Sequence, residues 1–230
     1  MLNITIDGMA GSGKSTLADK LAKKLNLAHF NTGNVYRAIA CHYLFSIGDN
    51  VSEKLINSFV KNLDVKVWFE GDNQVCNVNG NDYSKDLRTE KTSGFVSKIS
   101  PFVQIREIVR KIQREFAKKN NCVMEGRDIG RVVLKNANVK LFLTASPEVR
   151  AKRRFDQLKG NDDFESILQE IKQRDFEDIH REEGALIPAE DAIIIDTSFQ
   201  TLQETTDQCL KIVAEKCKNG YINKTKLKFN

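Results

Sequence analysis

The chain of 230 residues lacks long hydrophobic runs, paired cysteines and clustered histidines. Its apolar stretches, such as 139–145 and 192–195, are far too short to cross a bilayer. The first residues show no charged segment followed by an apolar one, so we expect no signal peptide. The five cysteines stand singly without C-x-x-C spacing, and the three histidines are isolated. This pattern favours reduced thiols in the cytoplasm over disulfides or a zinc site.

The net charge alone does not identify the function of the chain. The formal net charge is +5, from 36 basic and 31 acidic residues, and the basic residues are not gathered in one run. This mild excess does not favour a nucleic acid as partner, and we also expect a monomer with no membrane partner. The excess suits a cleft that holds polyanionic small molecules, although a solvated mixed surface accounts for the total equally well.

A phosphate-binding loop opens the chain. Residues 8–15 match the pattern G-x-x-x-x-G-K-[ST] in full, between a β-branched stretch at 2–7 and a helical pattern at 15–25. Glycine backbone can wrap a phosphate without Cβ clashes, and the amides at the helix start hold the anion. Lys14 would reach the β- and γ-phosphates, and the Ser15 hydroxyl would bind Mg²⁺. The residues expected to contact this nucleotide are Gly8, Met9, Ala10, Gly11, Ser12, Gly13, Lys14, Ser15 and Thr16.

Strands and helices alternate over most of the remaining chain. Apolar segments at 122–125, 139–143 and 193–196 have the length and content of buried parallel strands. This alternation predicts an α/β fold, a doubly wound P-loop domain with a parallel sheet flanked by helices. Helical patterns occur at 35–45, 52–60, from 89, 103–119, from 146, 163–182 and 202–218.

One segment breaks the alternation. Residues 64–70 and 74–79 alternate with period two around a turn at 71–73, which predicts a β-hairpin. We interpret residues of about 62–100 as a small α+β lobe inserted into a domain that spans 1–220. The basic residues 221–230 are expected to form a tail.

Five segments in this order resemble the bacterial cytidylate kinase family, over about residues 2–215. Other nucleoside monophosphate kinases share the P-loop but neither the insertion nor the G-R-D-I-G segment. The resemblance implies transfer of the ATP γ-phosphate to CMP or dCMP with Mg²⁺, and a nucleoside-monophosphate-binding role for the inserted lobe. Composition and spacing alone indicate only a P-loop phosphotransferase. The segments are 4–15, Asn31-Thr32-Gly33-Asn34-Val35-Tyr36-Arg37, Asp86-Leu87-Arg88-Thr89, Glu125-Gly126-Arg127-Asp128-Ile129-Gly130, and Arg174-Asp175-x-x-Asp178-x-x-Arg181.

Arginines recur at helical spacing, as phosphoryl transfer between two polyanions requires. Arg150, Arg153 and Arg154 share one helix face, at i, i+3 and i+4. The resemblance makes this group a short mobile lid, at about 148–160, over the ATP phosphates. A second group is expected to line one face of the following helix, with the arginines on the phosphates and the aspartate on the acceptor. A charged solvent face held by ion pairs is the alternative for both groups. The second group is Arg174, Asp178 and Arg181.

Recognition of the acceptor needs polar groups at the cytosine edge and cations at its phosphate. The resemblance assigns Thr32, Arg106 and Asp178 to the base. It assigns Arg37 and Arg127 to the acceptor phosphate. Asp128 would face the ribose, and Arg88 is a further candidate. Thr32 could instead belong to a turn and helix cap, and Arg106 could be a surface residue. The catalytic group is expected to be Lys14, Arg127, Arg174 and Arg181.

Glu125 ends a predicted buried strand beside the P-loop. That is the place for a carboxylate that holds the water shell of Mg²⁺, although a structural acid paired with Lys14 or Arg127 is the alternative. The family more often has aspartate there. Two further departures are Arg131, where threonine is usual, and 182–185, which replaces a more apolar stretch.

Two other functions remain open on the sequence. A P-loop kinase could use another acceptor, such as UMP or AMP. A nucleotide switch could bind and slowly hydrolyse its ligand, but the chain has no N-K-x-D segment for guanine. The arginine groups also have no purpose in a switch, so the kinase is favoured.

Overall fold

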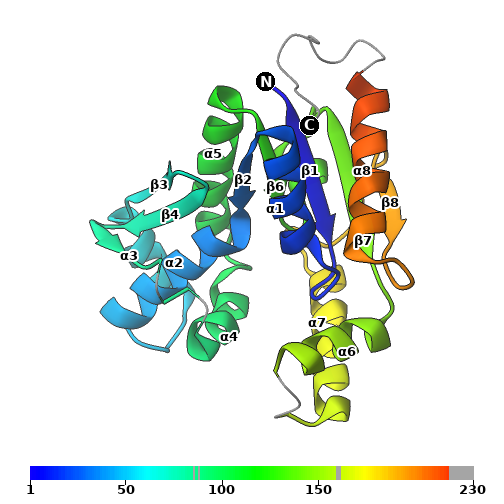
Figure 1. Ribbon diagram of the computed structural model, residues 1–230. Helices are drawn as coiled ribbons and strands as arrows, with labels where there is room; N and C mark the ends of the chain where they lie inside the picture. The colour runs from blue at the N-terminus through cyan, green and yellow to red at the C-terminus, as the bar shows by residue number, and fades with distance from the viewer. Residues whose placement is uncertain (85, 88, 159–161, 218–230) are drawn as a thin grey trace. The chain divides into compact units, whose positions relative to one another are not determined.

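The structure is a computed structural model that describes residues 1–84, 86, 87, 89–158 and 162–217 (Figure 1). The chain separates into two compact units. Unit 1 consists of Met1–His29 with Asn120–Asn230, and unit 2 is Phe30–Lys119. The P-loop therefore belongs to unit 1, whereas the predicted hairpin belongs to unit 2.

A five-stranded sheet with the order β2-β6-β1-β7-β8 organises unit 1 (Figure 1). β1 runs parallel to β6 on one side and to β7 on the other, and β8 continues in parallel beyond β7. The strand order reverses at β1, and ligands of such sheets bind beyond the carboxyl ends of the strands at this point. The predicted parallel α/β sheet is confirmed. Its strands are β1 (Asn3–Gly8), β2 (Ala28–Asn31), β6 (Cys122–Glu125), β7 (Val139–Thr144) and β8 (Ile193–Asp196).

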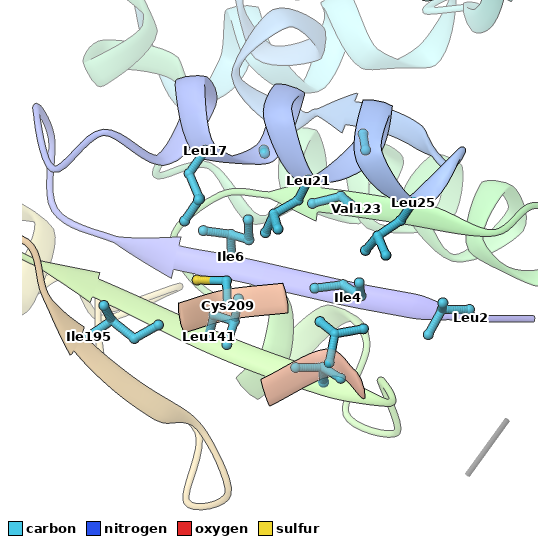
Figure 2. Close-up of a cluster of buried hydrophobic side chains, with 14 of the residues drawn as sticks. Leu2, Ile4, Ile6, Leu17, Leu21, Leu25, Val123, Leu141, Ile195 and Cys209 are labelled. Atoms are coloured by element: carbon cyan, nitrogen blue, oxygen red, sulfur yellow. The ribbon is translucent and has the colours of Figure 1, made fainter. Parts of the chain in front are cut away.

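The core of unit 1 lies between α1 (Lys14–Leu25) and the sheet. Leu17, Leu21 and Leu25 recur every fourth residue, so their side chains share the face that points at β1 (Figure 2). All three are 2% exposed or less, and burying each contributes roughly 2 kcal/mol. This packing holds the first turn of α1, and with it the P-loop, against the end of β1.

The described residues of unit 1 also form three further helices and one π-helical turn. Ser146 caps α6 by accepting a hydrogen bond from the Val149 amide, and Pro147 occupies the first helical position, as expected. Thr201 and Glu204 form a reciprocal capping box at the start of α8. The elements are η1 (Ile129–Val133), α6 (Pro147–Gln157), α7 (Phe164–His180) and α8 (Leu202–Lys216).

The end of α7 differs from the prediction. The helix was expected to reach Glu182, but it ends at His180, and Arg181 is extended with φ −62° and ψ 137°. The Leu186 amide returns to the Asp178 carbonyl at 2.7 Å and takes over one of the acceptors at the helix end. The acidic residues that follow would also be unfavourable at the negative end of the helix dipole.

The described residues of unit 2 form four helices and a three-stranded antiparallel sheet with the order β3-β4-β5. The predicted hairpin is confirmed, with Trp68 opposite Val75 in its register. Phe116 lies 5.0 Å from Phe30 and 5.2 Å from Phe69 between ring centroids, so α5 packs against the ends of both β2 and the hairpin. The elements are α2 (Thr32–Ser46), α3 (Glu53–Lys61), β3 (Val65–Glu70), β4 (Asn73–Val78), β5 (Asn81–Asp82), α4 (Glu90–Ile99) and α5 (Val103–Lys119).

All five cysteines are buried and free. Two of them, Cys41 and Cys76, lie in unit 2, and the other three lie in unit 1. Within the described ranges, no helix is both long enough and apolar enough to cross a membrane.

Candidate active site

The P-loop leaves β1 at Gly8 and enters α1 at Lys14. A Cβ at Gly8 would lie 2.0 Å from the Leu143 carbonyl oxygen, so only glycine lets β1 run this close to β7. Gly13 caps the helix in a left-handed conformation, with φ 90°, and brings no side chain to the first amides. The N-terminus of α1 therefore presents its amides and its positive dipole end to an anion.

Lys14 is buried at the start of this helix. Its Nζ donates to the Met9 carbonyl oxygen at 2.5 Å, so the side chain folds back along the loop. Burial lowers the pKa of Lys14 well below its ordinary value, and the nearby charge of Arg127 acts in the same direction. A bound phosphate would oppose both effects and favour the charged ammonium.

Glu125 lies at the end of β6, where its carboxylate meets α1 and β2. Ser15 Oγ donates to Oε2 at 2.7 Å, and His29 Nε2 lies 2.9 Å from Oε1. Burial alone would raise the pKa of Glu125. The hydrogen bond and charge of His29, with smaller effects from Ser15 and Lys14, outweigh burial and hold this pKa below its usual range. The carboxylate is thus ionised and held at both oxygens beside the P-loop.

Asp7 ties β1 to the G-R-D-I-G segment. Its carboxylate accepts hydrogen bonds from the Ile129 amide at 2.9 Å and the Gly130 amide at 2.8 Å. Burial raises the pKa of Asp7 to about 6, although these two backbone bonds oppose the rise. The next turn is η1, in which the carbonyl of the buried Asp128 accepts from the Val132 amide. Sequence reasoning did not single out Asp7.

The G-R-D-I-G segment also meets the end of α7. Arg127 Nε donates to Asp178 Oδ2 at 2.9 Å, and Arg181 Nη2 lies 2.8 Å from Oδ1. Asp178 is 3% exposed, and burial alone would raise its pKa. The charges of Arg127 and Arg181, the hydrogen bond from Arg127 and the charge of Arg174 instead hold this pKa below its usual range. Arg127, Asp178 and Arg181 are therefore in contact, and Arg174 is an exposed residue of α7.

Arg150 was predicted to bind the ATP phosphates. It is 1% exposed and forms a bidentate pair with Asp175 of α7, with Nη1–Oδ1 2.9 Å and Nη2–Oδ2 2.6 Å. Its Nε donates to the Ala145 carbonyl, and Nη1 donates to the P-loop carbonyl of Ala10 at 3.3 Å. The alternative of a charged solvent face held by ion pairs is therefore right about the ion pair but wrong about the exposure of Arg150. Its contact with ATP stays a prediction.

Arg153 connects α6 to the loop after β8. Its Nη1 and Nη2 donate to Oγ1 and the carbonyl of Thr197, at 3.1 and 2.6 Å. Thr197 Oγ1 in turn lies 3.3 Å from the Ser12 carbonyl of the P-loop. Both predicted ATP-binding arginines of α6 are therefore linked to the P-loop, one directly and one through Thr197.

In unit 2, Thr32 begins α2 and is buried. The cap is the preceding residue, Asn31, whose side chain accepts from the Asn34 amide at 3.1 Å. The Thr32 hydroxyl instead accepts from Nε2 of the buried Gln113 at 2.8 Å. The alternative interpretation of Thr32 as a helix cap is therefore wrong.

Arg37 and Arg106 occupy different elements of unit 2. A Cβ at Gly33 would lie 2.6 Å from Arg37 Nη1, so that guanidinium covers the first turn of α2. Arg106 is 4% exposed in α5, and its Nη1 lies 3.4 Å from the Ser100 carbonyl. The alternative of a surface residue is wrong for Arg106. Arg88 lies outside the described residues.

Four residues that hold these groups were missed by sequence reasoning: Asp7, His29, Gln113 and Asp175. Three of them act on partners that are between 81 and 122 positions away, so no local spacing marks them. Asp7 and Asp175 stood within quoted segments, but neither was assigned a role there.

The cytidylate kinase family profile matches residues 4–215. Proteins named cytidylate kinase from Clostridium botulinum (strain Okra / Type B1) and Caldicellulosiruptor saccharolyticus are each 42% identical to this chain. Each alignment covers 92% of this chain and at least 95% of the relative. A cytidylate kinase from Fervidobacterium nodosum is 40% identical over 94% of this chain and 97% of its own length.

Among solved structures, an uncharacterized protein from Eubacterium ventriosum superposes with a TM-score of 0.52 at 16% identity. The superposition covers 93% of this chain and 98% of that one, and it supports the α/β fold alone. The family profile and the relatives span nearly the whole chain, including the P-loop, the G-R-D-I-G segment and α7. The chain belongs to the cytidylate kinase family.

Proposed function

We propose that this protein transfers the γ-phosphate of ATP to CMP or dCMP, giving ADP and CDP or dCDP. The observation that carries the proposal is the gathering of cations around the P-loop in a chain of this family. Burial lowers the pKa of Lys14, and the charges of Arg127 and Arg174 lower it further. Cations held this close repel one another unless polyanions neutralise them, and ATP with a monophosphate supplies roughly six negative charges.

The donor phosphates would bind along the P-loop amides and the N-terminus of α1. Lys14 would leave the Met9 carbonyl and bind the β- and γ-phosphates, where it stabilises the charge that moves during transfer. Reaction between two phosphates needs little covalent chemistry from the protein beyond in-line positioning and charge neutralisation. We infer that Arg150 and Arg153 support this site from α6.

The residues beside the P-loop fit Mg²⁺. Ser15 and Glu125 offer hard oxygen donors, and the Glu125 carboxylate is buried and ionised. Ser15 would bind the ion directly and Glu125 through its water shell. When bound, the ion neutralises charge on the phosphates and orients them.

Each unit carries residues that we assign to the acceptor. We infer that Thr32 and Arg106 bind the base and that Arg37 binds the phosphate of CMP. In unit 1, Asp128 would bind the ribose and Asp178 the base. The cationic groups assigned to the transferred and accepting phosphates in unit 1 are Arg127, Arg174 and Arg181.

The remaining proposals concern organisation. We infer that residues of about 62–100 act as the monophosphate-binding lobe of a P-loop domain spanning 1–220, and that 148–160 act as the lid. The tail at 221–230 lies outside the described residues. We further propose that the protein acts as a cytoplasmic monomer, with nucleotides rather than nucleic acids or membranes as partners.

A coupled assay that detects ADP tests the function. ATP is supplied with CMP, dCMP, UMP and AMP in turn, with Mg²⁺ and with EDTA. We expect the highest kcat/KM with CMP or dCMP and no turnover in EDTA. A preference for UMP or AMP would assign another acceptor. Slow ATP hydrolysis that no monophosphate accelerates would instead indicate a nucleotide switch.

A further inference from the structure

His29 lies on β2 in unit 1, beside Glu125 at the end of β6. Its Nε2 is 2.9 Å from Glu125 Oε1, and its side chain is 18% exposed. The other carboxylate oxygen, Oε2, accepts from Ser15 Oγ at 2.7 Å. Glu125 therefore contacts both α1, whose start carries the P-loop, and β2, which neighbours β6 on the side away from β1.

The length of the Glu125 side chain explains why a contact with His29 matters for the position of the carboxylate. Glutamate has one more rotatable bond than aspartate, so its carboxylate reaches further but can adopt more positions. Ordering such a side chain costs conformational entropy. The Ser15 bond holds Oε2 and the His29 contact holds Oε1, so together they restrict rotation of the carboxylate plane.

The hydrogen-bond roles leave room for an ion. Ser15 uses its proton on Oε2, so the lone pairs of Oγ stay available. Each carboxylate oxygen has two lone pairs, and His29 occupies one of those on Oε1. A neighbouring group that orients a carboxylate in this way changes metal affinity without touching the metal.

We propose that His29 is a positioning residue, which holds Glu125 in the orientation that receives the nucleotide-bound Mg²⁺ through Ser15 and the water shell. The inference rests on the proposed function for the presence of Mg²⁺ with the nucleotide, but not on the identity of the acceptor. His29 itself does not contact the ion. A purely structural histidine would instead join β2 to β6 and affect only stability.

The test measures metal affinity apart from turnover. The protein is saturated with ADP, and Mn²⁺ is titrated while free Mn²⁺ is followed by electron paramagnetic resonance. ADP affinity in EDTA is measured by calorimetry, and stability by thermal unfolding. The variants are His29→Phe, which removes the ring nitrogens, and His29→Gln, whose amide nitrogen can replace Nε2. His180→Phe is the matched control, because that side chain is exposed on α7 and contacts the Phe176 carbonyl.

We expect His29→Phe to weaken Mn²⁺ binding roughly 10- to 100-fold, the usual effect of losing a group that orients a metal-binding carboxylate. ADP binding in EDTA should stay unchanged, His29→Gln should restore most of the Mn²⁺ affinity, and His180→Phe should match the wild type. Wild-type Mn²⁺ affinity in a folded His29→Phe protein would overturn the proposal. So would equal losses of Mn²⁺ and metal-free ADP binding.

Glu125→Asp supplies a second arm. The shorter side chain withdraws the carboxylate from His29, so adding His29→Phe to this variant should change Mn²⁺ affinity little. Equal effects of His29→Phe in both backgrounds would mean that His29 does not act through Glu125. Because CMP enters none of these measurements, the outcome is independent of which monophosphate the enzyme phosphorylates.

Discussion

Arg150 of α6 and Asp175 of α7 form a buried bidentate ion pair, with donor–acceptor distances of 2.9 and 2.6 Å. The same guanidinium reaches the carbonyl oxygens of Ala145 and Ala10, so one side chain joins two helices, the end of β7 and the P-loop. This arrangement gives Arg150 a structural role that its spacing in the sequence did not indicate.

Arg150→Met should therefore reduce stability, because it leaves the Asp175 carboxylate buried without its cation. Removing one partner of a buried pair costs about 3–5 kcal/mol, which urea unfolding would measure. The double variant Arg150→Met/Asp175→Leu should recover much of this loss. A variant with wild-type stability and a raised KM for ATP alone would show that Arg150 serves only the nucleotide.

Lys14→Ala should reduce kcat by about 100-fold or more, since it removes a cation that acts on the transferred phosphate. The fold should survive, because the hydrophobic core of α1 does not include this side chain. Lys24→Ala, at an exposed position of the same helix, is the control and should behave as the wild type. A Lys14→Ala enzyme that retains more than about a tenth of wild-type kcat would refute the catalytic role.

Arg37→Ala and Arg127→Ala should each raise the KM for CMP far more than the KM for ATP. Both are assigned to the acceptor phosphate, and an arginine contributes paired hydrogen bonds to such a group. Steady-state kinetics with each substrate varied at saturating levels of the other would measure the effect. If the KM for ATP rises and that for CMP does not, donor and acceptor groups have been exchanged in the assignment.

The buried Asp7 predicts a specific dependence of stability on pH. Its pKa is about 6 in the folded protein and near 3.8 in an unfolded chain, so the folded state keeps the proton between these values. The stabilisation is fully present below about pH 4 and is lost as pH rises through about 6, by on the order of 3 kcal/mol. Asp7→Asn cannot titrate and serves as the reference.

The difference in unfolding free energy, wild type minus Asp7→Asn, should therefore fall as the pH rises from 4 to 7. Chemical unfolding at a series of pH values measures it. A difference that is constant or that increases over this range would contradict the raised pKa.

Hydrogen exchange tests whether the proposed lobe responds to CMP and the proposed lid responds to ATP. Exchange in 62–100 should slow on addition of CMP and change little with ATP alone, because closure over the acceptor excludes water. Residues of about 148–160 should respond mainly to ATP. Equal protection of both segments by either nucleotide would not support separate roles.

Local patterns predicted most of the fold. The expected bounds of α5 and β6 agree with the structure, because a proline precedes the helix and apolar residues fill the strand. β2 was missed, since its four residues, of which only Phe30 is buried, show neither alternation nor a long apolar run. The π-helical turn η1 was also missed, since no residue pattern distinguishes its wider turn from a loop.

The sequence likewise identified some residues of the candidate site and missed others. The P-loop, Glu125 and the groups at Arg127 and Asp178 could be named from motifs. Their partners could not, because the bonds between Asp7 and Gly130 or between His29 and Glu125 join residues about a hundred positions apart. Such contacts depend on strand order in the sheet, which composition and spacing do not reveal.

The five buried cysteine thiols can serve as probes of local unfolding in the folded protein. Burial raises the pKa of Cys76 to about 11 and those of Cys122 and Cys209 to about 12, so very little reactive thiolate exists at neutral pH. An alkylating reagent would therefore report how often each region opens. Because the thiols are divided between the two units, the order in which peptides gain label would tell which unit opens first, and whether CMP or ATP delays that opening.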